Sequence, residues 1–214
     1  MPLLLCDLDN TIVDRAAAFV RWATQFAELH GRDGAFVEWL VEIDDDGYGP
    51  RPEFFEAFRD HLGLEESVEA VAEDYYRAFL PMFRTDEAVR VALVNARERG
   101  WQIAIVTNGP ATQEDKIRHA GLEALVDAWC VSGIEGYWKP DARLLEVAAE
   151  RTGTSLAEAW MIGDNPDTDI GAANDAGIRS VWLRIGRVWP RDDFAPTHEA
   201  DSFPEAVDLV LAHG

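Results

Sequence analysis

Cysteine is scarce in this sequence of 214 residues, because only Cys6 and Cys130 occur, each in an apolar stretch. Two isolated cysteines form neither a disulfide framework nor a zinc cluster, and buried free thiols are typical of a reducing cytoplasm. The five histidines are scattered without the spacing of metal ligands. We therefore predict a cytoplasmic protein without a zinc centre.

The sequence also has no long apolar runs and few positively charged residues. No stretch approaches the roughly 18 apolar residues of a membrane-spanning helix. The run Leu3–Cys6 has no basic flank and meets Asp7 at once, so we expect no signal peptide. The net charge is −21, from 19 lysines and arginines against 40 aspartates and glutamates. We expect no membrane and no nucleic acid as a partner, although a small phosphorylated ligand can bind with the help of a metal ion and a local cation.

From Thr85 onward the sequence alternates between helical spacing and apolar strands. Short helices between such strands indicate parallel pairing with right-handed crossovers. Together with a first strand that ends near Leu8, this pattern predicts an α/β fold with a Rossmann-like three-layer parallel sheet. The expected helices cover 86–99, 112–119, 140–151, 167–176 and 204–212, and the expected strands cover 101–107, 127–132, 159–164 and 179–184.

The connection between the first two strands is far longer than the dozen or so residues of a crossover. It contains four segments with aromatic or aliphatic residues at helical spacing: AAAFVRWATQFAELHG, GAFVEWLVEI, PEFFEAFRDHLG and SVEAVAEDYYRAFL. We predict a small helical cap domain over 15–84, inserted into a core domain of residues 1–14 and 85–214. The alternative is a set of extra helices packed on the sheet.

An acidic stretch stands out within the insertion, EIDDDGYGPRPEFF at residues 42–55. Asp44, Asp45 and Asp46 could meet a cationic or hydroxylated leaving group, and Arg51 an anionic one. A solvated loop before a helix is the favoured interpretation.

Polar residues follow four of the predicted strands at the point where each strand ends. In an open parallel sheet, ligands bind at these carboxyl ends. Each residue alone has an ordinary explanation, such as an Asx turn, a surface lysine or a helix cap, but their joint order points to one site. They are Asp7, Asp9, Thr107, Asn108, Lys139, Asp164 and Asp169.

This set of residues favours phosphoryl chemistry. Crowded carboxylates repel one another unless a cation lies among them, and an all-oxygen set suits Mg²⁺. A magnesium ion and a lysine ammonium can together neutralise the oxygens of a phosphoryl group. An aspartate can act as a nucleophile that forms an aspartyl-phosphate, while its neighbour acts as an acid and then as a base.

The four motifs, in this order, resemble those of the haloacid dehalogenase superfamily, in its phosphatase branch with a helical cap after the first strand. DLDNT resembles the first motif, Asp-x-Asp-x-Thr, with Asp7, Asp9 and Thr11. VTNG, KPD and GDNPDTDI resemble the second, third and fourth motifs. Asp9 favours phosphate esters, since the dehalogenases lack an aspartate two residues after the nucleophile.

The resemblance implies that Asp7 is the nucleophile and Asp9 the acid and base. It also implies a Mg²⁺ held by the carboxylates of Asp7 and Asp164 and by the main-chain carbonyl of Asp9.

Further residues would bind or support the phosphoryl group. The resemblance implies that Lys139, which is also catalytic, binds the phosphoryl oxygens together with Thr107 and Asn108. Thr11 and Asp169 would support the site without touching the substrate, Asp169 by orienting Lys139 or a metal-bound water.

The expected function is Mg²⁺-dependent hydrolysis of a small-molecule phosphate monoester by a monomer or homodimer. One alternative is a phosphosugar mutase with the same four motifs. A phospho-receiver module is another, although such modules are shorter, lack a cap, and do not carry their phosphorylated aspartate at the first strand. The last is a catalytically idle binding protein.

Overall fold

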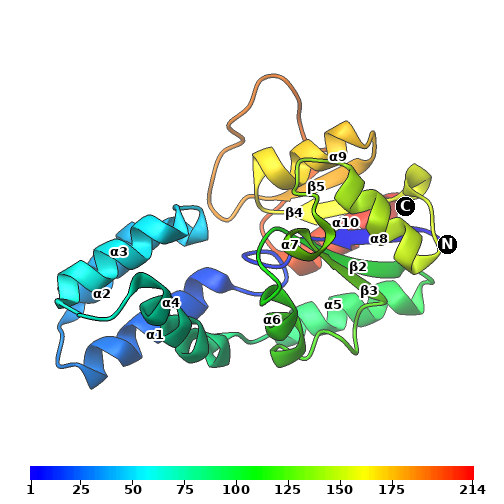
Figure 1. The fold of residues 1–214 in the computed structure, drawn as a ribbon. Helices are drawn as coiled ribbons and strands as arrows, with labels where there is room; N and C mark the ends of the chain where they lie inside the picture. Colours follow the sequence, from blue (N-terminus) through cyan, green and yellow to red (C-terminus); the bar gives the residue numbers. More distant parts are fainter. The chain divides into compact units, whose positions relative to one another are not determined.

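Six parallel strands form one sheet in the computed structural model, which describes all residues from 1 to 214 (Figure 1). The chain divides into two compact units, residues 1–13 with 85–214, and residues 14–84. The sheet belongs to the first unit and has the order β3-β2-β1-β4-β5-β6. Its strands are β1 (Leu3–Cys6), β2 (Gln102–Thr107), β3 (Ala128–Val131), β4 (Trp160–Gly163), β5 (Arg179–Leu183) and β6 (His198–Ala200).

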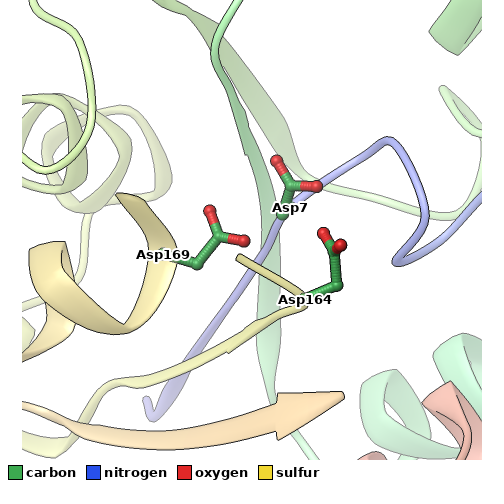
Figure 2. Close-up of side chains that lie close together, drawn as sticks. All are labelled: Asp7, Asp164 and Asp169. Carbon is green, nitrogen blue, oxygen red and sulfur yellow. The ribbon is translucent and has the colours of Figure 1, made fainter. Parts of the chain in front are cut away.

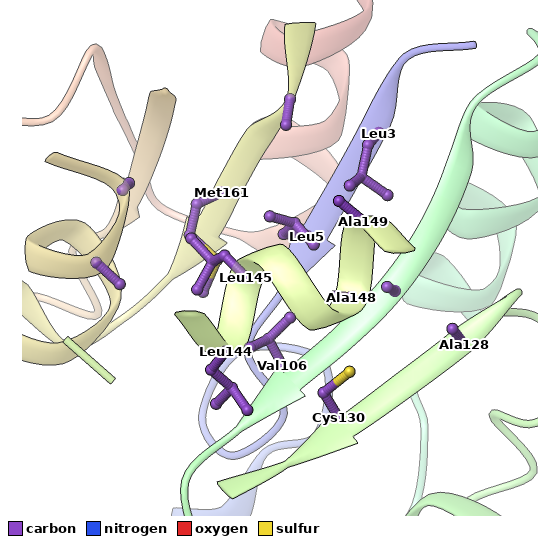
Figure 3. Close-up of a cluster of buried hydrophobic side chains, with 14 residues drawn as sticks. Leu3, Leu5, Val106, Ala128, Cys130, Leu144, Leu145, Ala148, Ala149 and Met161 are labelled. Carbon is purple, nitrogen blue, oxygen red and sulfur yellow. The ribbon is translucent and has the colours of Figure 1, made fainter. Parts of the chain in front are cut away.

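Helices pack on both faces of the sheet, which makes the three layers that the sequence predicts. On one face, Leu3 and Leu5 of β1 join a buried cluster with Leu144, Leu145 and Ala148 of α8 (Figure 3). Because side chains alternate along a strand, Leu4 and Cys6 point to the opposite face. The helices of this unit are α5 (Glu87–Glu98), α6 (Gln113–His119), α7 (Ser132–Glu135), α8 (Arg143–Thr152), α9 (Gly171–Asp175) and α10 (Phe203–His213).

The predicted fold class is confirmed, with small differences at four elements, one of which is the short helix α7, which was not predicted. The short strand β6 was not predicted, because its three residues, His-Glu-Ala, carry no apolar run. Helix α8 begins at Arg143 and not at Pro140, since the Asp141 N–H donates to the Trp138 carbonyl and closes a turn first. The helix predicted over 167–176 is divided into a π-helical turn, η4 (Pro166–Ile170), and α9. No helix in the structure combines the length and the apolar character that crossing a membrane requires.

The second unit is built from four helices around an aromatic core. The ring of Trp22 lies 4.6 Å from that of Tyr75 and 5.8 Å from that of Phe58, between centroids. Asp14 and Ser67 begin two of the helices by accepting hydrogen bonds from main-chain N–H groups. The helices are α1 (Arg15–Leu29), α2 (Gly34–Asp44), α3 (Arg51–Leu62) and α4 (Val68–Phe79).

The acidic stretch at 42–55 contains a buried ion pair, so its interpretation as a solvated loop is wrong for Asp44. Only 2% of Asp44 is exposed, and its two carboxylate oxygens accept hydrogen bonds from Arg15 at 2.6 and 2.7 Å. Arg51 donates to Asp44 Oδ1 at 2.9 Å. A Cβ atom at Gly47 would lie 2.6 Å from Arg15 Cζ, so this arrangement also requires glycine at position 47.

We expect Asp44→Asn to lower the free energy of unfolding by about 3–5 kcal/mol, because Arg15 would stay buried without its counter-charge. Urea unfolding measures this change. Asp45→Asn is the matched control, since Asp45 is exposed, and it should alter stability by less than about 0.5 kcal/mol. Equal stabilities of the two variants would contradict the structural role of Asp44.

Candidate active site

The strand order changes direction between β1 and β4. The chain runs outward from β1 to β2 and β3, and then returns to the other side of β1 with β4. Ligands bind at such a switch point, beyond the carboxyl ends of the strands. Asp7 follows β1 directly and Asp164 follows β4 directly, so both side chains belong to this place.

Three buried aspartates meet there (Figure 2). Carboxylate oxygens of Asp7, Asp164 and Asp169 all lie within 4.8 Å of one another. The Asn165 N–H donates to Asp169 Oδ2 at 3.0 Å, which fixes the third carboxylate at the start of η4. A Cβ atom at Gly163 would overlap the side chain of Asp169, so glycine is required just before Asp164.

The ammonium of Lys139 lies between two of these carboxylates. Its Nζ is 2.6 Å from Asp7 Oδ1 and 2.7 Å from Asp169 Oδ1, and it also donates to the Val106 carbonyl at 2.6 Å. Only 1% of the side chain is exposed. Asn108 holds the main chain here, because its Nδ2 donates to the Lys139 carbonyl and its Oδ1 accepts from the Lys139 N–H, both at 2.9 Å.

Burial dominates the electrostatics of this cluster. It raises the pKa of Asp7 well above its ordinary value, and Asp169 and Asp164 add to the rise, whereas Lys139 opposes it. Burial alone would lower the pKa of Lys139, but the carboxylates of Asp169 and Asp7 outweigh this effect and raise it. Lys139 therefore stays charged, whereas the charged form of Asp7 is disfavoured unless a further cation lies beside it.

The donor set of this cluster fits a magnesium ion. The three buried carboxylates supply only oxygen, and no histidine or cysteine is among them. Hard divalent cations such as Mg²⁺ prefer these ligands, and a cation would favour the charged form of Asp7, which burial disfavours. Arg187 contacts the same region, with its Nη2 2.7 Å from the main-chain carbonyl of Asp164 and 3.2 Å from Asp164 Oδ2.

Asp9 and Thr107 lie in a second polar network. Gln113 on α6 joins them, because its Nε2 donates to Asp9 Oδ2 at 3.0 Å and to Thr107 Oγ1 at 2.9 Å. Lys116 on the same helix contacts both carboxylate oxygens of Asp9. Thr11 is buried, and its hydroxyl has no hydrogen-bond partner.

The structure thus brings together most of the residues singled out in the sequence. Asp7, Lys139, Asp164 and Asp169 form one buried cluster, while Asn108 braces the main chain of Lys139. Three further residues take part that the sequence analysis did not name: Gln113, Lys116 and Arg187.

A family model described as haloacid dehalogenase-like hydrolase matches residues 1–177. The chain belongs to the haloacid dehalogenase-like hydrolases. Among curated members, a phosphoserine phosphatase of Thermus thermophilus is 38% identical, over 87% of this chain and 90% of the relative. A glyceraldehyde 3-phosphate phosphatase of Pyrococcus abyssi is 26% identical, over 87% of this chain and 83% of the relative.

Solved structures of haloacid dehalogenase-like hydrolases show the same fold. The magnesium-bound hydrolase YfnB from Bacillus subtilis has a TM-score of 0.80 at 22% identity, and the match covers 98% of each chain. The predicted family is therefore confirmed, and the chain is a hydrolase.

Proposed function

We propose that the protein is a Mg²⁺-dependent phosphatase that hydrolyses a small phosphate monoester through a phospho-aspartate at Asp7. The observation that carries this proposal is the buried ammonium of Lys139 between Asp7 and Asp169 at the carboxyl end of β1. This geometry provides a nucleophile next to a cation that can bind a phosphoryl oxygen. The named activities of the two curated relatives are phosphatase activities, which supports the same chemistry.

The carboxylates of Asp7 and Asp164 and the main-chain carbonyl of Asp9 would hold the magnesium ion. When bound, the ion neutralises negative charge on the phosphoryl oxygens. Such charge stabilisation matters because phosphate monoesters hydrolyse extremely slowly without a catalyst, and acid–base help alone contributes only about 10²–10⁴-fold.

The proposed reaction has two displacement steps at phosphorus. A carboxylate oxygen of Asp7 forms a bond to phosphorus while the ester P–O bond breaks, and Asp9 gives a proton to the leaving alkoxide. A water molecule then attacks the phosphorus of the phospho-aspartate, Asp9 takes a proton from that water, and inorganic phosphate leaves. Lys139, Thr107 and Asn108 bind the phosphoryl oxygens, and Asp169 orients the Lys139 ammonium.

The helical unit of residues 14–84 would act as the cap of this enzyme and select the substrate. Its insertion directly after β1 supports this role, since inserted lids commonly sequester a reaction from water. Asp44 would serve the stability of this cap and not contact the substrate, because Arg15 and Arg51 already bind its carboxylate.

A panel of phosphate monoesters tests the proposal, with O-phosphoserine, glyceraldehyde 3-phosphate and a hexose 1-phosphate as its first members. We expect at least one ester to release inorganic phosphate with a kcat of roughly 1–10³ s⁻¹ in the presence of Mg²⁺. A chelator should lower this rate at least ~100-fold, and added Mg²⁺ should restore it, because a bound metal ion contributes several kcal/mol of stabilisation.

Two outcomes of the panel would contradict the proposal. Conversion of the hexose 1-phosphate to its 6-phosphate without release of phosphate would make the protein a mutase. Turnover that is insensitive to the chelator would exclude the metal-dependent mechanism.

A further inference from the structure

Lysine is rare in this chain, and both lysines lie at the candidate active site. Of the 19 basic residues, 17 are arginines, and the two lysines are Lys116 and Lys139. Lys139 contacts Asp7 and Lys116 contacts Asp9, each at 2.6 Å. Since the chain uses arginine for its surface ion pairs, these two positions indicate a need for a compact ammonium. The proposed function explains Lys139 but leaves Lys116 without a role.

Lys116 fixes both oxygens of the Asp9 carboxylate. Its Nζ lies 2.7 Å from Asp9 Oδ1 and 2.6 Å from Oδ2, and only 11% of its side chain is exposed. Gln113 precedes Lys116 by three residues on α6, so the two side chains share one face of the helix. Because Gln113 also donates to Asp9 Oδ2 and to Thr107 Oγ1, Asp9 is linked to the end of β2.

The loop after β2 makes room for this arrangement. Gly109 has φ of +155°, and a Cβ atom there would lie 2.7 Å from Gln113 Cγ. The side chain of Gln113 is itself buried. A residue larger than glycine at position 109 would therefore displace the amide that joins Asp9 to Thr107.

We infer that Lys116, together with Gln113, is a positioning residue that holds the side chain of Asp9 in one orientation, so that its carboxyl group gives a proton to the leaving oxygen and the resulting carboxylate is bound by the Lys116 ammonium. The inference rests on the proposed role of Asp9. The side chain of Asp9 is 25% exposed and could rotate toward water if its donors were removed. A misplacement of about 1 Å can cost a catalytic group roughly 10²-fold in rate, so fixed donors on both oxygens have a large effect.

Kinetics with two kinds of ester test this role. An alkyl phosphate needs a proton on its leaving oxygen, whereas p-nitrophenyl phosphate has a leaving group that departs as the anion. We expect Lys116→Met to lower kcat/KM for the alkyl phosphate by about 10–100-fold and to change the value for p-nitrophenyl phosphate little. Arg118→Met is the matched control on the same helix, because Arg118 pairs with Glu114 and is exposed, and it should leave both values unchanged.

A double-mutant cycle shows whether Lys116 acts through Asp9. We expect Asp9→Asn to slow turnover of the alkyl phosphate at least about tenfold, and Lys116→Met to add no further loss in that background. Equal losses for both esters, or additive effects in the cycle, would overturn the inference.

The scarcity of lysine allows a measurement that does not depend on activity. In protein labelled with ¹³C at lysine Cε, NMR should show two lysine signals, and Lys116→Met should remove one of them. Asp9→Asn should shift the Lys116 signal and leave that of Lys139 nearly unchanged, because Lys139 contacts Asp7 and Asp169 instead. An unshifted Lys116 signal would overturn the inference.

Absence of turnover in the wild-type protein on every ester would overturn the proposed function, whereas an active enzyme that tolerates Lys116→Met would overturn the positioning role alone.

Discussion

Asp7→Asn is expected to lower kcat by ~10⁴-fold or more, because an amide cannot form the covalent bond to phosphorus. The substitution also removes a carboxylate from the buried acidic cluster, so it weakens Mg²⁺ binding. Phosphate release under saturating Mg²⁺ and substrate measures the loss. Acid-quench trapping of labelled enzyme should detect a phosphoenzyme in the wild-type protein and none in the variant.

The same substitution has a predicted effect on stability. Burial raises the pKa of Asp7 above its ordinary 3.8. A carboxyl group with a raised pKa contributes most to stability below pH 3.8, and this contribution is lost as the pH rises through the raised value. In metal-free protein at pH 7, the free energy of unfolding of Asp7→Asn, measured with urea, should therefore be at least that of wild type. In acid, the variant should be no more stable than wild type.

Asp167→Asn is the control for Asp7→Asn. Asp167 belongs to the fourth motif but is exposed and pairs with Arg191. We expect it to keep near-normal activity, since it has no contact with the buried cluster. Retention of turnover in Asp7→Asn, or loss of activity accompanied by unfolding, would refute the role of Asp7 as nucleophile.

Much of the fold and the placement of the acidic cluster could be predicted from the sequence. In a parallel sheet the carboxyl ends of all strands lie at one edge. The position of Asp7, Lys139 and Asp164 in the chain, each at or after the end of a strand, was therefore enough to predict that they meet. Lys139 lies eight residues beyond the end of β3. Its position next to Asp7 also depends on the two hydrogen bonds between the Asn108 side chain and the Lys139 main chain.

The buried ion pair of the helical unit could not be predicted from the sequence. Arg15 and Asp44 are 29 residues apart, and a run of three aspartates is typical of a solvated loop. The burial of Asp44 follows from how α1 packs against α2, which periodicity does not specify. Gly47 lies nearby, and a Cβ atom at this position would clash with Arg15. In the sequence, however, Gly47 looks the same as an ordinary turn glycine.

The network around Asp9 was missed for a related reason. Gln113 and Lys116 lie on a short polar helix whose pattern resembles an ordinary solvated surface. Only the path of the chain from β2 into α6 places their side chains against Asp9 and Thr107. The one available signal was compositional, since Lys116 is one of just two lysines in the chain.

Lys139→Met should damage both stability and catalysis. It would leave buried carboxylates of Asp7 and Asp169 without the ammonium that now lies 2.6 and 2.7 Å from them. Removing one partner of a buried charge pair costs about 3–5 kcal/mol, so we expect a loss of this size in urea unfolding of the metal-free protein. The rate should fall by about 10²–10³-fold even where the variant is folded, because a donor to the phosphoryl oxygens is lost.

Magnesium provides the decisive comparison for this variant. If one cationic centre can partly replace another, added Mg²⁺ should raise the Tm of Lys139→Met by more than that of wild type, while activity stays low. Lys139→Arg should not restore activity, because three oxygens, from Asp7, Asp169 and Val106, surround a single Nζ atom at 2.6–2.7 Å and leave no room for a planar guanidinium. If metal-free Lys139→Met were as stable as wild type, the Lys139 ammonium would not stabilise the buried carboxylates. That result would contradict the electrostatic explanation of the site.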